Sequence, residues 1–158
     1  MNPIILGGIL RNFYDSLDMA QFDMRLKIQK VVYLMKAKDM NLGYDFSLYL
    51  YGPYSIELTR DAFQISDLVK NFSGIDKVIP SDKKEDFSKF ILELEKDSRK
   101  DNPVWLEIVA SYLFLKRIGY ESDKEIIKRI KEKRPDFNIP EDEIKKIIKE
   151  INEGGFFI

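Results

Sequence analysis

The sequence predicts a mainly α-helical domain of about seven helices with a small two-stranded β element. Two observations lead to this fold class. Apolar residues recur at helical spacing through most of the chain. Strands and helices do not alternate, as a parallel sheet would require. Since 158 residues fit one domain, we expect a single domain over residues 1–158.

The N-terminal half is predicted to contain three helices and the β element. Apolar residues cover most of the helix at 22–38, so we expect it at the centre of the fold. Residues 45–51 alternate in polarity and include aromatic residues, which is typical of a strand. Gly52-Pro53 is expected to end this strand, because proline cannot donate to a ladder. The other expected elements are helices at 3–17 and 55–71, the latter capped by Ser55, and a candidate second strand at 77–80.

The C-terminal half is predicted to be entirely helical. Its four helices begin at recognisable start signals: Ser81 with Asp82, Asn102-Pro103, a capping box of Ser122 and Glu125, and Pro140 with Glu141. The final residues, Phe156-Phe157-Ile158, are expected either to fold back onto the core or to form an exposed docking tag.

Composition excludes several classes of function. The chain has no cysteine and no histidine, so it cannot form disulfides, thiolate metal sites or histidine-dependent hydrolase centres. Glu57 and Asp61 lie four residues apart on a predicted helix, but nothing marks a third ligand. We therefore expect no enzymatic activity, no cofactor and no metal. The net charge of −1 limits any nucleic-acid site to a local patch.

The N-terminal apolar run has no basic leader and is too short to span a bilayer. We therefore expect a cytoplasmic protein that does not enter a membrane.

The most informative residues are a helical segment, 25–34, and a turn, 51–58. Lys30 falls within a largely apolar helix surface and needs a partner, which Glu57 or the carbonyl groups of the 51–55 turn could supply. One interpretation is structural: Lys30 reaches toward solvent and the aromatic side chains of the turn pack on the helix. The other is a sticky aromatic surface beside basic side chains. The residues proposed to bind a partner are Lys27, Lys30, Tyr49, Tyr51, Pro53, Tyr54 and Glu57.

The same helix carries a local excess of positive charge. A basic helix followed by a strand loosely resembles the recognition helix and wing of a winged-helix protein. This gives an alternative, a nucleic-acid-binding regulator. Its proposed contacts are Arg25, Gln29, Lys36 and Lys38.

Two motifs together carry a family resemblance. Arg-Leu-Lys-Ile-Gln-Lys-Val-Val-Tyr at 25–33, followed by Tyr-Gly-Pro-Tyr-Ser-x-Glu-Leu at 51–58, resembles the YwgA-like family of uncharacterised proteins. More distantly, the pattern is similar to the Panacea antitoxin domain of SocA- and GepA-like proteins. Residues 105–111 and 133–137 also resemble the YwgA-like pattern. The positions that match the first two motifs are Lys27, Gln29, Lys30, Tyr33, Tyr51, Gly52, Pro53, Tyr54, Ser55 and Glu57.

The resemblance implies a helical domain with a winged-helix-like N-terminal half and a non-enzymatic role. Panacea domains neutralise toxins, and SocA acts as an adaptor that delivers its partner to a protease. We therefore expect a protein-interaction module that is antitoxin-like or an adaptor, whose protein partner is a toxin or a protease substrate.

Overall fold

The computed structural model describes residues 1–68, 72, 74–120, 122–136 and 138–153, with the side chain of Leu68 left out. Seven α-helices and one two-stranded antiparallel sheet occur in this part of the chain, which confirms the mainly α fold class. The expected tail at 156–158 lies outside the described residues. The elements are α1 (Pro3–Leu10), α2 (Phe22–Ala37), β1 (Ser47–Tyr49), β2 (Gly52–Tyr54), α3 (Ile56–Leu68), the 3-10 turn η2 (Ser81–Lys83), α4 (Lys84–Lys96), α5 (Pro103–Arg117), α6 (Asp123–Lys133) and α7 (Glu141–Asn152).

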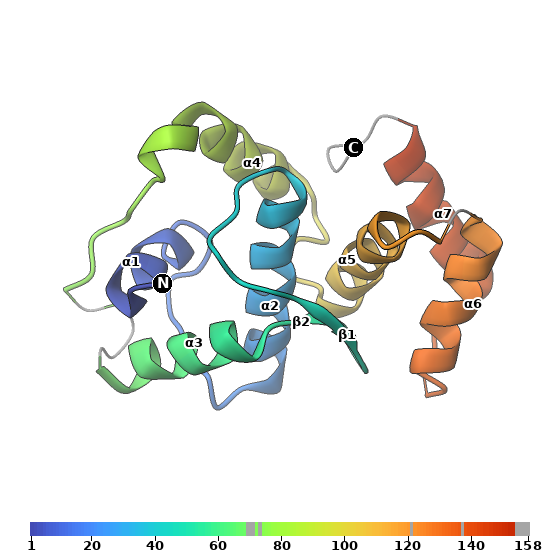
Figure 1. Ribbon diagram of the computed structural model, residues 1–158, viewed down its shortest axis with the longest axis horizontal. Helices are drawn as coiled ribbons and strands as arrows, with labels where there is room; N and C mark the ends of the chain where they lie inside the picture. The colour runs from blue at the N-terminus through green and yellow to red at the C-terminus, as the bar shows by residue number, and fades with distance from the viewer. Residues whose placement is uncertain (69–71, 73, 121, 137, 154–158) are drawn as a thin grey trace.

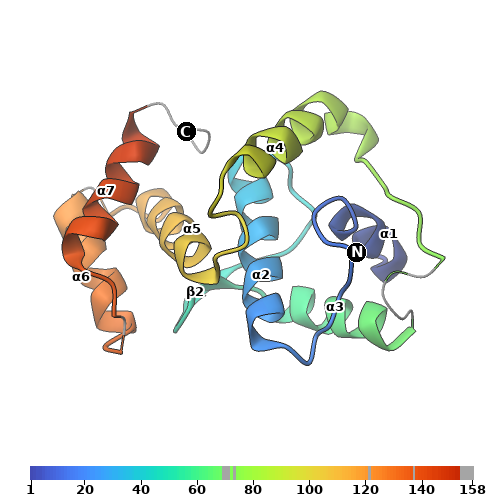
Figure 2. The same cartoon turned by 180° about the vertical axis from the view of Figure 1, so that it is seen from behind.

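Helix α2 lies in the middle of the molecule, as its apolar circumference predicts (Figure 1). Every residue from Ile28 to Met35 is buried. Helices α1, α3 and α4 lie to one side of α2, and α5, α6 and α7 lie to the other, an arrangement that Figure 2 shows from behind. Helix α5 packs directly against α2, while α6 and α7 pack on α5 and on each other.

The second strand of the sheet is not at residues 77–80, where the sequence predicts it. Strand β1 pairs with β2, so Ser47 lies opposite Tyr54 and Tyr49 opposite Gly52. Gly52-Pro53 therefore continues the sheet after a two-residue turn at Leu50-Tyr51 instead of ending it. Proline is tolerated here because each strand of a two-stranded ribbon is an edge strand. Residues 77–80 form no strand, and the Val78 N–H donates to the Gly8 carbonyl of α1 (2.9 Å).

Helix α1 ends at Leu10, well before the expected end at residue 17. The reason is a contact with a distant segment. The Asn12 amide nitrogen donates to the carbonyl oxygens of Gly8 and Ile9 at the end of the helix, and also to that of Val78 (3.0 Å). The helix ends here because the Asn12 side chain binds the last helical carbonyl groups together with the Val78 carbonyl group.

The expected helix starts at Ser55, Asn102 and Ser122 are confirmed. The Ser55 hydroxyl accepts from the Leu58 N–H (3.3 Å), and the Asn102 and Ser122 side chains cap α5 and α6 in the same way. The helix expected to start at Ser81 begins instead with the 3-10 turn η2. Residues 69–71, where α3 was expected to end, lie outside the described part of the chain. No helix in the described ranges combines the length and apolar character needed to cross a membrane.

We predict that Gly8→Ala destabilises the protein, although alanine is normally the better helix former. A Cβ atom on Gly8 would lie 2.6 Å from the Asp76 carbonyl oxygen and 2.5 Å from Val78 Cγ2. The backbone cannot relieve this clash without separating α1 from residues 76–78. Chemical denaturation should show a loss of about 2 kcal/mol.

Gly7→Ala is the matched control, because its Cβ would meet only side-chain atoms of Ile65 and Ile75, at 3.1 Å or more. Equal free energies of unfolding for the two variants would contradict the importance of the close approach at Gly8.

Candidate functional site

Two neighbouring side chains of α2 hold the backbone that leads from the hairpin into α3. Lys30 is 1% exposed, and its Nζ donates to the Pro53 carbonyl oxygen (2.8 Å). The Gln29 amide nitrogen donates to the Ser55 carbonyl oxygen (3.0 Å), and its amide oxygen accepts from the Ser55 N–H (2.8 Å). Gln29 also donates to the Thr59 hydroxyl (2.7 Å). The sequence offers two partners for Lys30, Glu57 or a carbonyl group of the 51–55 turn, and the structure shows the carbonyl. The side chain of Glu57 is exposed.

A second buried polar group lies beneath the hairpin on α5. Glu107 is 2% exposed, and its carboxylate accepts from Arg134 Nη1 (2.8 Å). Arg134 also donates to Asp136 (3.1 Å), and its guanidinium carbon lies 4.3 Å from the centre of the Tyr51 ring. These contacts connect α5, the segment after α6 and the tip of the hairpin.

Burial changes the acidity of both charged groups under the hairpin. Burial raises the pKa of Glu107 from its usual 4.5 to about 7, although the nearby charges of Arg134 and Lys30 act in the opposite direction. Burial also lowers the pKa of Lys30 from 10.5 to about 8, opposed by the charge of Glu107. The attraction between these groups therefore offsets only part of the free energy lost when water is removed from them.

Gly52 allows the hairpin to lie directly on this buried group. Its φ is +93°, a backbone conformation that favours glycine. A Cβ atom at this position would lie 2.6 Å from the Ser111 hydroxyl oxygen and 3.6 Å from Glu107 Cγ. Any larger residue would force the hairpin away from α5.

The outer side of the hairpin is apolar and aromatic. Tyr49 is 46% exposed and Leu50 is 50% exposed at the turn. Tyr49 packs edge-on against Tyr54 (5.2 Å between ring centres), and Tyr51 packs in the same way against the exposed Phe22 of α2 (5.0 Å). We call Phe22, Tyr49, Leu50, Tyr51 and Tyr54 the hairpin surface.

The structure divides the residues that the sequence proposes for partner binding. Tyr49 is exposed, and Tyr51 and Tyr54 are half-buried at the hairpin surface. Lys30 and Pro53 are buried and do not belong to any exposed surface, which corrects the sequence-based assignment. Lys27 is half-buried, and its Nζ lies 5.7 Å from the centre of the Tyr14 ring.

The residues proposed to contact nucleic acid serve mainly internal contacts. Gln29 is buried, so its assignment to a contact surface is also corrected. Arg25 donates to the Met19 carbonyl (2.8 Å) and Lys36 to the Tyr44 carbonyl (2.8 Å), while Lys38 is half-buried. The hairpin of β1 and β2 follows α2 in the chain, and the winged-helix likeness stays a prediction.

Glu57 and Asp61, the two acidic residues considered as metal ligands, both lie on α3. Asp61 accepts a hydrogen bond from the Tyr44 hydroxyl (2.7 Å). Within the described ranges, no three acidic residues come together in a group that could hold a metal ion.

Sequence reasoning missed Glu107 and Arg134 as members of the site. Glu107 does carry a signal, because it is the one charged residue in the apolar run 103–115 of α5. A lone carboxylate in such a run is either exposed or paired in the interior. Arg134 carries no comparable signal, since basic residues are frequent throughout 124–134.

No protein-family model, curated protein or solved structure matches the chain. The resemblance to the YwgA-like family and the Panacea domain therefore stays a prediction.

We predict that Glu107 makes stability depend on pH between about 4.5 and 7. Because its folded-state pKa is raised, the native state holds more protons than the unfolded state in this range. The corresponding stability is fully present below pH 4.5 and is lost as the pH rises through about 7. Relative to Glu107→Gln, the unfolding free energy of the wild type should fall by about 3 kcal/mol across the range.

The measurement is chemical denaturation of both proteins at a series of pH values. Glu132→Gln, which removes an exposed carboxylate of α6, controls for the general effect of charge. Parallel curves for wild type and Glu107→Gln would contradict the prediction. Lys30 acts in a separate range, since its lowered pKa affects stability between about pH 8 and 10.5.

Proposed function

We propose that the chain is a non-enzymatic interaction module that binds a protein partner through the hairpin surface. The observation that carries this proposal is the exposure of Tyr49 and Leu50 at the tip of a hairpin whose backbone is anchored from inside. Tyrosine and other aromatic side chains are enriched at the energetic centres of protein interfaces. An exposed apolar group next to ordered aromatic rings is the kind of surface that a partner protein covers.

The buried anchors support a binding role for the hairpin. Two-stranded hairpins are marginally stable alone. Lys30 and Gln29 hold this one in a single conformation, so less conformational entropy is lost when a partner binds. A buried charge such as Lys30 often gives no more stability than an apolar residue of similar size would. We therefore propose that buried Lys30 serves to fix one conformation of the hairpin and not to raise the stability of the fold.

The finer proposal, an antitoxin-like protein or an adaptor, rests on the resemblance carried by residues 25–33 and 51–58. In that case the partner is a toxin or a protease substrate, and the complex forms in the cytoplasm, where a chain without cysteine needs no oxidising environment. The nucleic-acid-binding regulator has less support, because Gln29 is buried and Arg25 and Lys36 donate to carbonyl groups of the chain itself.

We predict that Leu50→Ser abolishes capture of a protein partner while it leaves stability nearly unchanged. Leu50 is half exposed at the turn, so its replacement should change the free energy of unfolding by less than about 0.5 kcal/mol. The measurement is affinity capture from the native host at low and high salt, with and without nuclease. The wild type should retain a discrete protein under all four conditions.

Leu92→Ser is the matched control, because Leu92 is a 62% exposed leucine on α4, outside the hairpin surface. This variant should capture the same partner as the wild type. Retention of the partner by Leu50→Ser would place the interface elsewhere. Recovery of nucleic acid that is lost at high salt would instead favour the regulator, since phosphate contacts weaken steeply with salt.

A further inference from the structure

A small pocket lies between the hairpin, α5 and α6. Its lining includes Leu48, Tyr49, Leu50 and Gly52 of the hairpin, Glu107 and Ser111 of α5, and Arg129 and Lys133 of α6. Its volume is about 10 Å³, the space of a single water molecule, and it is partly open to solvent. No whole ligand fits inside, so only the end of one side chain could reach these polar groups from the rim.

Two cations of α6, Arg129 and Lys133, line this pocket without an ion-pair partner among the described residues. Arg129 and Lys133 are four residues apart and share one face of the helix, where like charges disfavour one another. Neither makes a hydrogen bond or an ion pair with any residue that the structure describes. The Arg129 Nε–H is buried without an acceptor among those residues, which costs free energy until an acceptor is supplied.

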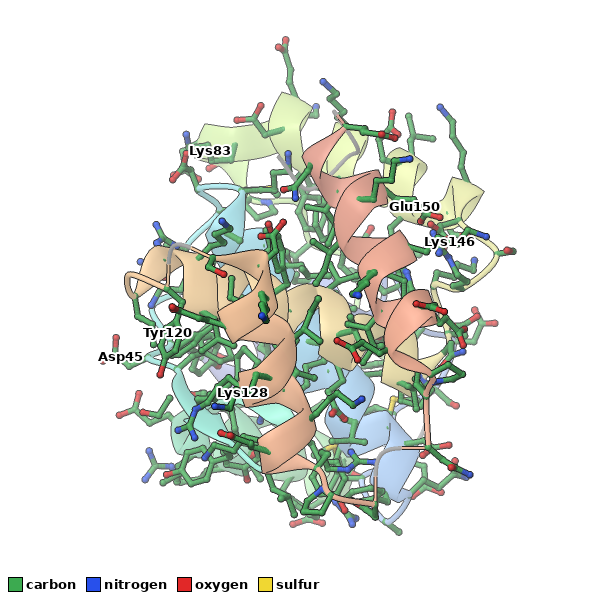
Figure 3. All side chains as sticks on the ribbon, turned by 90° about the vertical axis from the view of Figure 1, so that its right-hand side faces the viewer. Asp45, Lys83, Tyr120, Lys128, Lys146 and Glu150 are labelled. Carbon is green, nitrogen blue, oxygen red and sulfur yellow. The ribbon has the colours of Figure 1, made fainter. Side chains whose placement is uncertain are left out.

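Other cations of the same helix are treated differently. On the outer side of α6, Lys128 pairs with Glu132 (3.9 Å) and Lys131 pairs with Glu141 of α7 (3.8 Å). Figure 3 shows this outer side, with Lys128 on α6 turned toward the viewer. Glu107, which lines the same pocket, makes its ion pair with Arg134 and lies within ion-pair distance of neither Arg129 nor Lys133. Arg129 and Lys133 therefore leave unpaired positive charge on the part of α6 that lines the pocket with the hairpin.

We propose that the rim of this pocket receives a carboxylate side chain of a protein partner, which pairs with Arg129 and Lys133 while apolar residues beside it pack on Tyr49 and Leu50. The inference rests on the proposed function and adds the chemistry of the partner. The recognised segment is a peptide in which Asp or Glu lies next to apolar residues. The positive charges of Arg129 and Lys133 favour the acidic residue of the peptide, and the exposed side chains of Tyr49 and Leu50 favour its apolar neighbours.

A single carboxylate fits these surroundings better than a nucleic-acid backbone. The two cations lie in a chain whose net charge is −1, and the first turn of α7 exposes Glu141, Asp142 and Glu143. A polyanion that extended from the pocket toward α7 would meet these negative charges. One acidic side chain held at the rim would not.

The test uses the intact protein and a library of random short peptides displayed on phage. The wild type should enrich peptides that contain Asp or Glu beside apolar residues. A synthetic copy of an enriched peptide should bind about tenfold more weakly when its acidic residue is changed to the amide, and Arg129→Gln with Lys133→Gln should cause a similar loss. Lys128→Gln, which removes an outer cation of the same helix, should bind like the wild type.

Charge reversal separates a lost contact from a damaged fold. Lys133→Glu should shift the selection toward peptides with Lys or Arg at the same position, which a misfolded protein could not do. If the wild type enriches peptides that depend on Leu50 but show no preference for acidic residues, the proposed function stands and the carboxylate site is overturned. Enrichment of no peptide would contradict both. A further outcome is that the wild type retains a random single-stranded oligonucleotide pool that Lys133→Glu does not retain. That result would show that the site binds phosphate and not carboxylate, and it would overturn the inference.

Discussion

The position of the hairpin and the start of α3 both depend on the hydrogen bonds from α2 to the backbone of residues 53–55. Gln29 binds both the N–H and the carbonyl of Ser55, as a neighbouring strand would, at the point where the two-stranded ribbon ends. Ser55 also caps α3 through its hydroxyl. One residue therefore ends the hairpin, begins the next helix and is attached to the central helix, so α3 and the α1 helix packed on it are placed relative to α2.

The helices could be predicted because each depends mainly on its own residues. Periodicity locates them, and the caps at Ser55, Asn102 and Ser122 depend on local hydrogen bonds. The strand pairing could not be predicted in the same way. Alternation marks a strand but does not identify its partner, and the proline after Gly52 is typical of a strand end. The early end of α1 depends on Asn12 meeting Val78, a contact between residues distant in sequence.

The same division applies to the site. A lysine within an apolar helix surface predicts an internal acceptor, and the structure provides one at Pro53. The exposure of Tyr49 also follows from its place on a short strand beside a turn. The ion pair of Glu107 with Arg134 could not be predicted from the sequence, because 27 positions separate the two residues and only the packing of α6 on α5 brings them together. That Arg129 and Lys133 have no ion-pair partner among the described residues is likewise a property of the packed molecule.

The attachment of the last two helices has a consequence for motion. Helices α6 and α7 pack on α5 and on each other, whereas the hairpin contacts both α2 and α5. Segments with few neighbours open locally at a lower free energy than the core. A ligand that touched both the hairpin and α6 would restrict this opening, and the loss of conformational entropy would be transmitted to α7 without a change in the average fold. Binding of a ligand between the hairpin and α6 would thus reduce the conformational freedom of α7.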